Sequence, residues 1–128
     1  MDDRLIARLI AAGRVLFGVL CIASPKLLLQ KQAAVTPGQA IWMLRAFGIR
    51  DVVLGAGALA SLNADEPDPD WVRMGAIADS ADAVAALAFR KELGPQALIA
   101  TLSLAVPASL LGWKSAMGLA RRSAGATR

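Results

Sequence analysis

The chain lacks several side chains on which many active sites and metal sites depend. Its 128 residues include no histidine, no tyrosine and a single cysteine, Cys21. A zinc site built from Cys and His and a disulfide within this chain are therefore both excluded. Cys21 stands between Leu20 and Ile22, and we interpret it as a small apolar packing residue rather than a reactive thiol.

Charged residues are scarce, and apolar residues are abundant. Charged residues make up 19% of the chain and hydrophobic residues 56%, with a mean hydropathy of +0.52. Ordinary soluble domains reach roughly 45–50% apolar residues even when glycine is counted, so the excess indicates a lipid environment. The net charge of +4 resides mostly near the ends of the chain. No basic helical face or aromatic platform accompanies it, which argues against a nucleic-acid partner and favours cationic ends on a membrane protein.

The apolar residues fall into four segments, at 5–29, 40–62, 71–91 and 96–117. Leu and Ala dominate them, which favours helix over strand. Each segment has about the ~20 residues needed to cross a hydrocarbon layer ~30 Å thick. Between them lie turn signals, among them the acidic, proline-broken stretch 63–70 and the pair Gly94-Pro95. We therefore predict an all-α fold, a four-helix transmembrane bundle, in which residues 1–128 form a single membrane-embedded domain.

The second segment is difficult to reconcile with a lone membrane-spanning helix, because it contains Arg45, Arg50 and Asp51. Three charges near the membrane centre cost roughly 8–10 kcal/mol on insertion scales, and the apolar residues return only about 3–6 kcal/mol. The segment can span a membrane if Arg45 reaches the headgroups and the Arg50-Asp51 pair finds partners inside a bundle.

Ionisable residues of three segments are expected at a similar depth, and each shares a helical stripe with small residues. We predict an interior ionic cluster of Arg14, Arg50, Asp51, Asp79 and Asp82. Small residues allow membrane helices to approach closely, and we predict that four glycines serve as helix-packing positions: Gly18, Gly48, Gly55 and Gly75. The cluster contains two arginines and three aspartates, so that one surplus negative charge calls for a proton or a bound cation.

Two further motifs resemble ligand-binding sites but lack the partners that such sites require. The stretch Asp79-Ser80-Ala81-Asp82 resembles acidic pairs that hold Mg²⁺ over a diphosphate, but no second acidic motif accompanies it. The stretch Gly55-Ala56-Gly57 superficially copies a dinucleotide fingerprint, yet the regular alternation of strands and helices that such a site requires is missing. We expect neither a metal nor a cofactor.

The stretch Gly48-Ile49-Arg50-Asp51-Val52-Val53-Leu54-Gly55 resembles a signature of a family of small, uncharacterised four-helix membrane proteins. Members have a Gly-x-Arg-Asp…Gly pattern in the second helix, a first helix that ends at proline, here Pro25, and a Gly…Asp pattern in the third, here Gly75 to Asp79. The resemblance covers roughly residues 13–90. It implies a fold and a membrane location, but no activity and no catalytic residues. A more distant likeness to DoxX-type membrane proteins fits the Arg-Asp pair less well.

These observations predict a multi-pass protein of the cell membrane without catalytic activity. We expect an accessory or scaffolding subunit that contacts the lipid bilayer and a larger membrane complex or copies of itself. The alternatives are a small transporter or proton-handling protein that uses the cluster, and a soluble, very apolar helical domain. The distribution of basic residues places both termini in the cytoplasm. The side of the membrane with the termini would carry Arg4, Arg8, Lys114, Arg121, Arg122 and Arg128. The opposite side would carry Lys26, Lys31, Arg90 and Lys91.

Overall fold

The computed structural model describes residues 2–29, 37–65 and 68–126, and every regular element within them is a helix. The prediction of an all-α fold is confirmed for these residues. Lys31 and Arg128, which entered the charge comparison of the two sides, lie outside them. The helices are α1 (Asp3–Ala23), α2 (Pro25–Leu29), α3 (Pro37–Asn63), α4 (Asp70–Ala88) and α5 (Arg90–Ala126).

The helix boundaries differ from the predicted segments, most clearly in the first and the fourth. The first segment divides into α1 and the short α2, because Ser24 leaves the helical conformation (φ −134°, ψ 53°) directly before Pro25. The residue before a proline is disfavoured in the helical conformation, which accounts for the break. The fourth helix is longer than 96–117 and ends at Ala126. The turn predicted at Gly94-Pro95 is present as a kink in α5, where Gly94 has φ 74°, a conformation that glycine adopts without a steric penalty.

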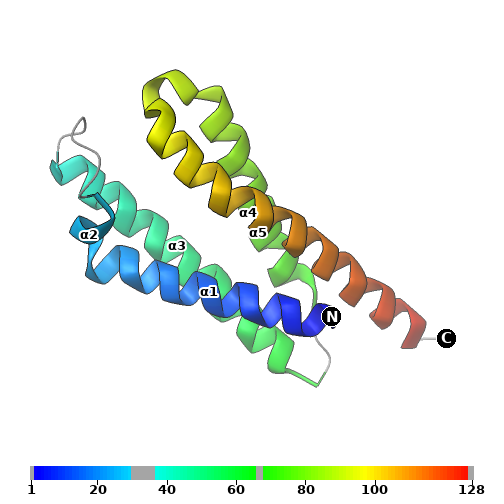
Figure 1. Ribbon diagram of the computed structural model, residues 1–128. Helices are drawn as coiled ribbons and strands as arrows, with labels where there is room; N and C mark the ends of the chain where they lie inside the picture. Colours follow the sequence, from blue (N-terminus) through cyan, green and yellow to red (C-terminus); the bar gives the residue numbers. More distant parts are fainter. Residues whose placement is uncertain (1, 30–36, 66–67, 127–128) are drawn as a thin grey trace.

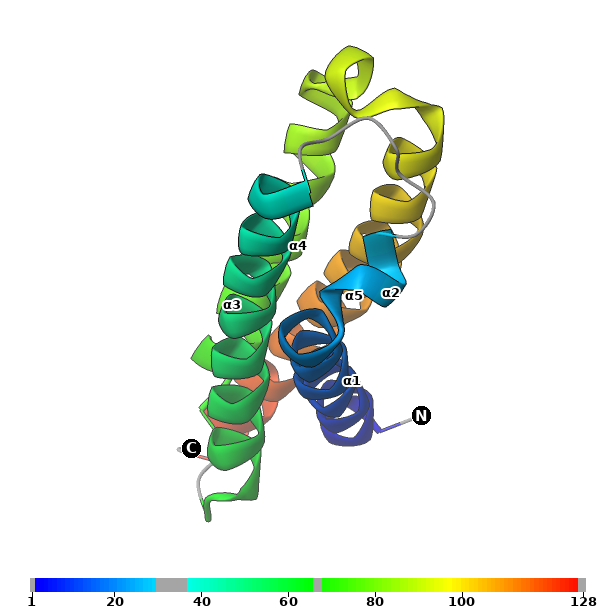
Figure 2. The same ribbon diagram turned by 90° about the vertical axis from the view of Figure 1, so that its left-hand side faces the viewer.

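The long helices form two hairpins. α1 packs most extensively on α3, and α4 packs most extensively on α5, while the contacts between the hairpins are fewer and join α1 to α5 and α3 to α4. Figure 1 shows the two hairpins meeting near the chain termini and diverging toward α2 and the α4–α5 turn. This turn projects beyond the beginning of α3 (Figure 2). The described ends of the chain lie at the same end of the molecule as the connection between α3 and α4.

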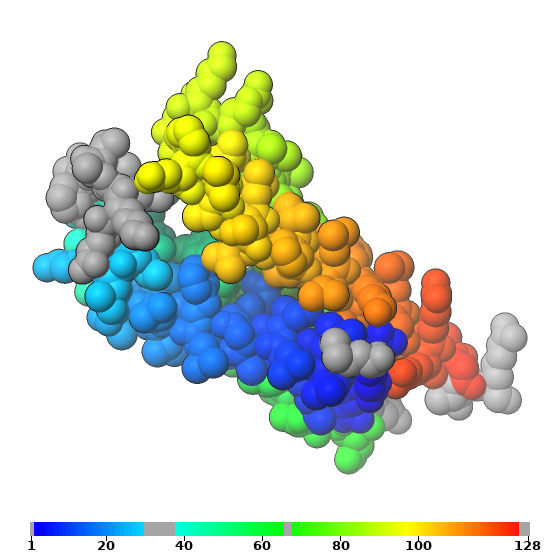
Figure 3. All heavy atoms as spheres, viewed as in Figure 1, coloured from blue at the N-terminus to red at the C-terminus, as the bar shows by residue number. Residues whose placement is uncertain are grey.

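Small residues predominate among the buried apolar residues, and many large apolar side chains lie on the surface. The buried apolar residues are mostly alanines, and a central cluster contains Ala7, Ala11, Ala58, Leu62, Val72, Ala116 and Leu119. Large apolar side chains lie outside, for example Leu16 at 72% exposure, Trp42 at 71% and Ile99 at 67%. On the side of the molecule shown in Figure 3, α1 and α5 draw apart toward α2. The surfaces of α1 and α5 that face each other do not cover one another there.

Two of the described helices are long and apolar enough to cross a membrane. These are α1, with a mean hydropathy of 2.1, and the stretch Arg90–Gly125 of α5, with 1.5. α3 and α4 do not meet the same criterion, because the charges within them lower their mean hydropathy. By itself this is weak evidence for a membrane location, since a core helix of a soluble protein or a signal sequence can have the same length and composition.

Candidate functional site

Four of the five residues of the predicted cluster lie at the centres of their helices. The midpoints of α1, α3 and α4 fall at residues 13, 50 and 79. Arg14, the Arg50-Asp51 pair and Asp79 therefore each occupy the middle turn of their helix. The structure brings all five residues of the predicted cluster together at this level, through side-chain contacts that join α1, α3 and α4.

Arg14 is the central member of the cluster. Its Nη1 donates to Asp51 Oδ1 at 3.1 Å, and its Nη2 donates both to Asp79 Oδ2 and to the Gly75 carbonyl oxygen, the latter at 2.8 Å. The three side chains are at most 10% exposed. One guanidinium on α1 therefore binds a carboxylate of its own hairpin partner α3 and another of α4, in the geometry that suits the planar fork of arginine.

Arg50 forms the second half of the cluster. It donates from Nη1 to Asp82 Oδ1 at 2.9 Å and from Nη2 to Asp82 Oδ2 at 2.6 Å, and Nη2 also lies 3.4 Å from Asp51 Oδ1. Its guanidinium carbon stands 4.2 Å from the centre of the Phe47 ring, a cation–π contact. Phe47 in turn meets Phe17 of α1 edge to face. The Arg50 and Asp82 side chains are 34% and 22% exposed, so this pair is the open side of the cluster.

The predicted glycines lie where the helix backbones come closest to the cluster. A Cβ on Gly18 would stand 2.5 Å from the Gly48 carbonyl oxygen, and a Cβ on Gly48 would stand 2.6 Å from the Gly18 carbonyl oxygen. A Cβ on Gly55 would approach the Ala11 carbonyl oxygen to 2.6 Å, and one on Gly75 would lie 3.3 Å from Arg14 Nε. The first three glycines let α1 and α3 touch backbone to backbone, and Gly75 leaves space for the arginine.

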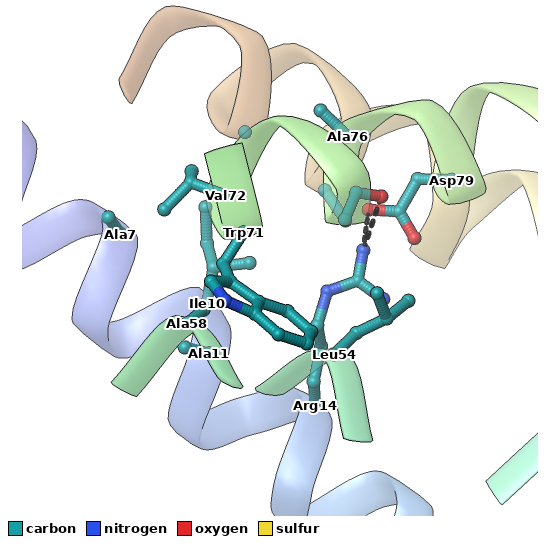
Figure 4. A pocket seen from close by; sticks show the side chains of 13 residues that line it. Ala7, Ile10, Ala11, Arg14, Leu54, Ala58, Trp71, Val72, Ala76 and Asp79 are labelled. Carbon is teal, nitrogen blue, oxygen red and sulfur yellow. Dashed lines mark hydrogen bonds and ion pairs between the residues drawn. The ribbon is translucent and has the colours of Figure 1, made fainter. Parts of the chain in front are cut away.

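A small cavity adjoins the buried half of the cluster. It is lined by alanines together with Ile10, Leu54, Trp71, Val72, Gly75 and the pair Arg14–Asp79, as Figure 4 shows for most of these side chains. Its volume is ≈ 10 Å³, about the least that a single water molecule needs. The cavity can hold one water beside Arg14 and Asp79, but it cannot admit an organic substrate.

The cluster can exchange protons or bind a positive charge, but it has no nucleophile with an adjacent base. Its five side chains are bound mainly to one another, and two arginines face three carboxylates. Among the described residues, no group of three or more Cys, Asp or Glu side chains is arranged to hold a metal ion. Arg45, expected to reach toward headgroups, donates through Nε to the Ile22 carbonyl oxygen at 3.3 Å.

Sequence reasoning missed a polar contact between α4 and α5. The Ser80 hydroxyl lies 2.7 Å from the Ser109 hydroxyl and accepts a hydrogen bond from Trp113 Nε1 at 3.1 Å. Serine hydroxyls are common hydrogen-bonding links between packed membrane helices. Ser109 and Trp113 are four residues apart and therefore share one face of α5. This spacing is the feature of the sequence from which a polar contact on that face can be predicted.

A second missed feature joins the helix ends on the side of the termini. Arg4 donates to the Leu62 carbonyl oxygen at 2.6 Å and Arg8 donates to it at 3.2 Å, which satisfies the end of α3. Asp2 caps α1 by accepting from the Arg4 backbone N–H and also pairs with Arg122 at 2.9 Å. These two partners, the backbone N–H first, hold the pKa of Asp2 below its ordinary value.

Comparison of the chain with protein-family models, with curated proteins and with solved structures gives no match.

Proposed function

We propose that the protein is a multi-pass integral membrane protein without catalytic activity, an accessory or scaffolding subunit of a larger membrane complex. The observation that carries the proposal is the distribution of side-chain size. Alanines fill the interior, whereas large apolar side chains such as Leu16, Ile99 and Leu110 are 66–72% exposed. Exposed apolar surface on this scale is costly in water, and small residues at the contacts are what membrane helices use to associate.

The environment of α5 supports the same reading. Only 11% of an apolar 18-residue stretch of α5 is buried inside the protein. The core helix of a soluble domain would be mostly buried, so α5 is better explained as a helix that faces lipid or a partner. Four crossings, by α1, α3, α4 and α5, place both termini on one side, and the basic residues near the termini favour the cytoplasm. The resemblance of residues 48–55 to the small four-helix membrane family points in the same direction.

The state of the ionic cluster favours a structural role over catalysis. Its arginines and aspartates are bound to one another across three helices, and the adjoining cavity has room for one water. Paired charges inside a membrane bundle satisfy each other and define how the helices are oriented. A scaffold needs such a junction, and it needs an apolar outer surface for docking.

One observation favours the second candidate, a proton-handling protein. The cluster has one more carboxylate than guanidinium groups, and intramembrane carboxylates are common in proton pathways. The two candidates differ in what they require of Asp79. In proteoliposomes that enclose a pH-sensitive dye, a transporter loses proton flux when Arg14→Leu and Asp79→Leu are combined. A scaffold shows no flux with either the natural chain or the double variant.

Carbonate extraction tests the membrane location. We expect the chain to remain in the membrane pellet, and its release into the supernatant would refute the proposal.

The orientation in the membrane is tested with a membrane-impermeant thiol reagent in a Cys21→Ala background. The exposed positions Lys91 and Ser123 lie at opposite ends of the bundle. We expect Lys91→Cys to react in intact cells and Ser123→Cys to react only after permeabilisation.

A further inference from the structure

α3 and α4 face each other up to the Arg50–Asp82 ion pair and diverge beyond it. Residues seven apart share a helix face, and on α3 one such face contains Gly57, Arg50 and Met43. Gly57 lies under the Trp71 ring, and Arg50 binds Asp82, but Met43 is 63% exposed. On α4 the matching face runs from Asp82 toward Phe89, the residue that directly follows α4 and is 60% exposed.

Among the residues that the structure describes, the helix faces beyond the ion pair are therefore exposed. We call them the open faces and define them by Met43 on α3, by Ala85 on α4 and by Phe89, which directly follows α4. They lie on the side where the two hairpins separate in Figure 1. Their side chains are apolar, and the Arg50–Asp82 pair stands where the two faces begin to separate.

This ion pair is unusual in its position. Arg50 is the middle residue of α3, so in the membrane proposed above the pair lies near mid-depth. Its side chains nevertheless keep 34% and 22% of their surface exposed. Charged groups that face hydrocarbon at this depth are costly, and in membrane proteins they are met by a partner or by water.

The charge of the cluster indicates the chemistry of that partner. Two guanidinium groups face the carboxylates of Asp51, Asp79 and Asp82, which leaves a formal charge of −1. A carboxylate has about four acceptor positions, and Asp82 uses two of them on Arg50. Asp82, the most exposed of the three carboxylates, can therefore accept one more donor from the side of the open faces.

We propose that the open faces receive a transmembrane helix of a partner protein that carries a single Lys or Arg near its middle. The apolar residues of the partner helix would pack on Met43, Ala85 and Phe89, and its cation would bind Asp82 and neutralise the cluster. This inference rests on the proposed function and names the chemistry of its docking partner.

Two other occupants of the open faces, a second copy of this chain and lipid, would not neutralise the negative charge of the cluster. In a second copy of this chain, the central cations Arg14 and Arg50 already bind carboxylates, and the outward residues at the same depth include Ile49 and Val53, which are apolar. Lipid acyl chains bring no charge at all. A partner helix with a central cation supplies both the apolar surface and the missing positive charge.

The test uses the full chain in phosphatidylcholine vesicles, labelled with a donor dye at Ser123→Cys in a Cys21→Ala background. Three leucine-rich transmembrane peptides carry an acceptor dye. One has lysine at its centre, one has leucine there, and one has its lysine near the end. We expect the central-lysine peptide to bind roughly tenfold more tightly than the other two, the size of one polar contact between membrane helices. Equal energy transfer from all three peptides overturns the proposal, and this comparison needs no variant within the cluster.

Two variants locate the binding. Asp82→Asn should abolish the preference for the central-lysine peptide, whereas Asp70→Asn, which removes the same charge at the exposed start of α4, should keep it. A preference that persists in Asp82→Asn overturns the assignment to this site. Energy transfer between donor-labelled and acceptor-labelled copies of the chain, lost when the central-lysine peptide is added, would identify a second copy as the occupant and overturn it too. If the chain remains in the membrane pellet but shows no preference, this inference fails alone. Release by carbonate removes the proposed function as well.

Discussion

Arg14 on α1 and Asp79 on α4 form an ion pair that joins the two helical hairpins at the middle of the molecule. Both side chains are almost fully buried, and Arg14 also binds Asp51 of its own hairpin. The contacts between hairpins are otherwise few. The pair therefore has a larger share in the relative position of the hairpins than any single apolar contact between alanines can have.

Removal of one member of this pair should destabilise the protein strongly. Arg14→Leu leaves the carboxylates of Asp79 and Asp51 without this guanidinium, whereas Asp79→Leu leaves Arg14 with Asp51 alone. Breaking a buried pair costs about 3–5 kcal/mol, and Arg14→Leu should therefore be the more costly of the two. The double variant should cost less than the sum of the single losses, because Asp79 is no longer present to lack its partner and Asp51 keeps Arg50 at 3.4 Å. Thermal stability in detergent measures all three. The exposed pair Asp70–Arg73 is the control, and its coupling should be below about 1 kcal/mol. Strict additivity for Arg14 and Asp79 would contradict the structure.

The closest backbone approach predicts a difference between two glycines of α1. Gly18→Ala places a methyl group 2.5 Å from the Gly48 carbonyl oxygen, so that α1 and α3 must separate, at a cost of about 1–3 kcal/mol. Gly13 has no atom within 4 Å of the corresponding position, and Gly13→Ala should be neutral or stabilising by up to about 1 kcal/mol because alanine favours helix. Unfolding in detergent measures both. An equal effect of the two substitutions would show that α1 and α3 do not touch at Gly18.

Two serines, the buried Ser115 and the half-buried Ser80, should respond differently to alanine. The Ser115 side chain is fully buried, and its hydroxyl has no hydrogen-bond partner among the described residues. Ser115→Ala should therefore be neutral or stabilising, since it removes an unsatisfied polar group at a position where that group costs about 1–3 kcal/mol. Ser80→Ala removes the acceptor of Trp113 and the partner of Ser109, and it should cost on the order of 0.6 kcal/mol or more. The same unfolding measurement compares them, and a greater loss for Ser115→Ala would contradict this account.

The contact between the two ends of the chain should depend on pH. The Arg4 backbone N–H and Arg122 lower the pKa of Asp2 in the folded protein. A group with a lowered folded pKa contributes stability above its ordinary pKa, and this stability is lost as the pH falls through the folded value. The natural chain should therefore be more stable than Asp2→Asn at pH 7, and the difference should disappear well below about pH 4. Asparagine also caps helices, so the comparison isolates the charge. A difference that is independent of pH would assign the effect to the cap alone.

Much of the helix content follows from local pattern. The apolar segments and the turn signal at Gly94-Pro95 predicted the long helices, and the proline at position 25 marks where the first segment breaks. The extension of α5 to Ala126 was missed because its last residues are polar and lie beyond the apolar run. The stripes of glycine and charge could be written from the sequence alone, since residues three and four apart share a side of a helix. The link between Ser80 and Trp113 was missed, because the two residues lie 33 positions apart.

The sequence by itself determined that this chain is helical and apolar, and that its charges in three helices stand beside small residues. These properties depend on composition and on spacing along one helix, which act over a few residues. Only the tertiary structure decided that Arg14 binds Asp51 and Asp79 while Arg50 binds Asp82, and that α3 and α4 diverge beyond this pair. Which arginine meets which carboxylate depends on the rotation and crossing of whole helices. Those are determined by contacts between residues far apart in the chain, such as Gly18 with Gly48 and Gly57 with Trp71.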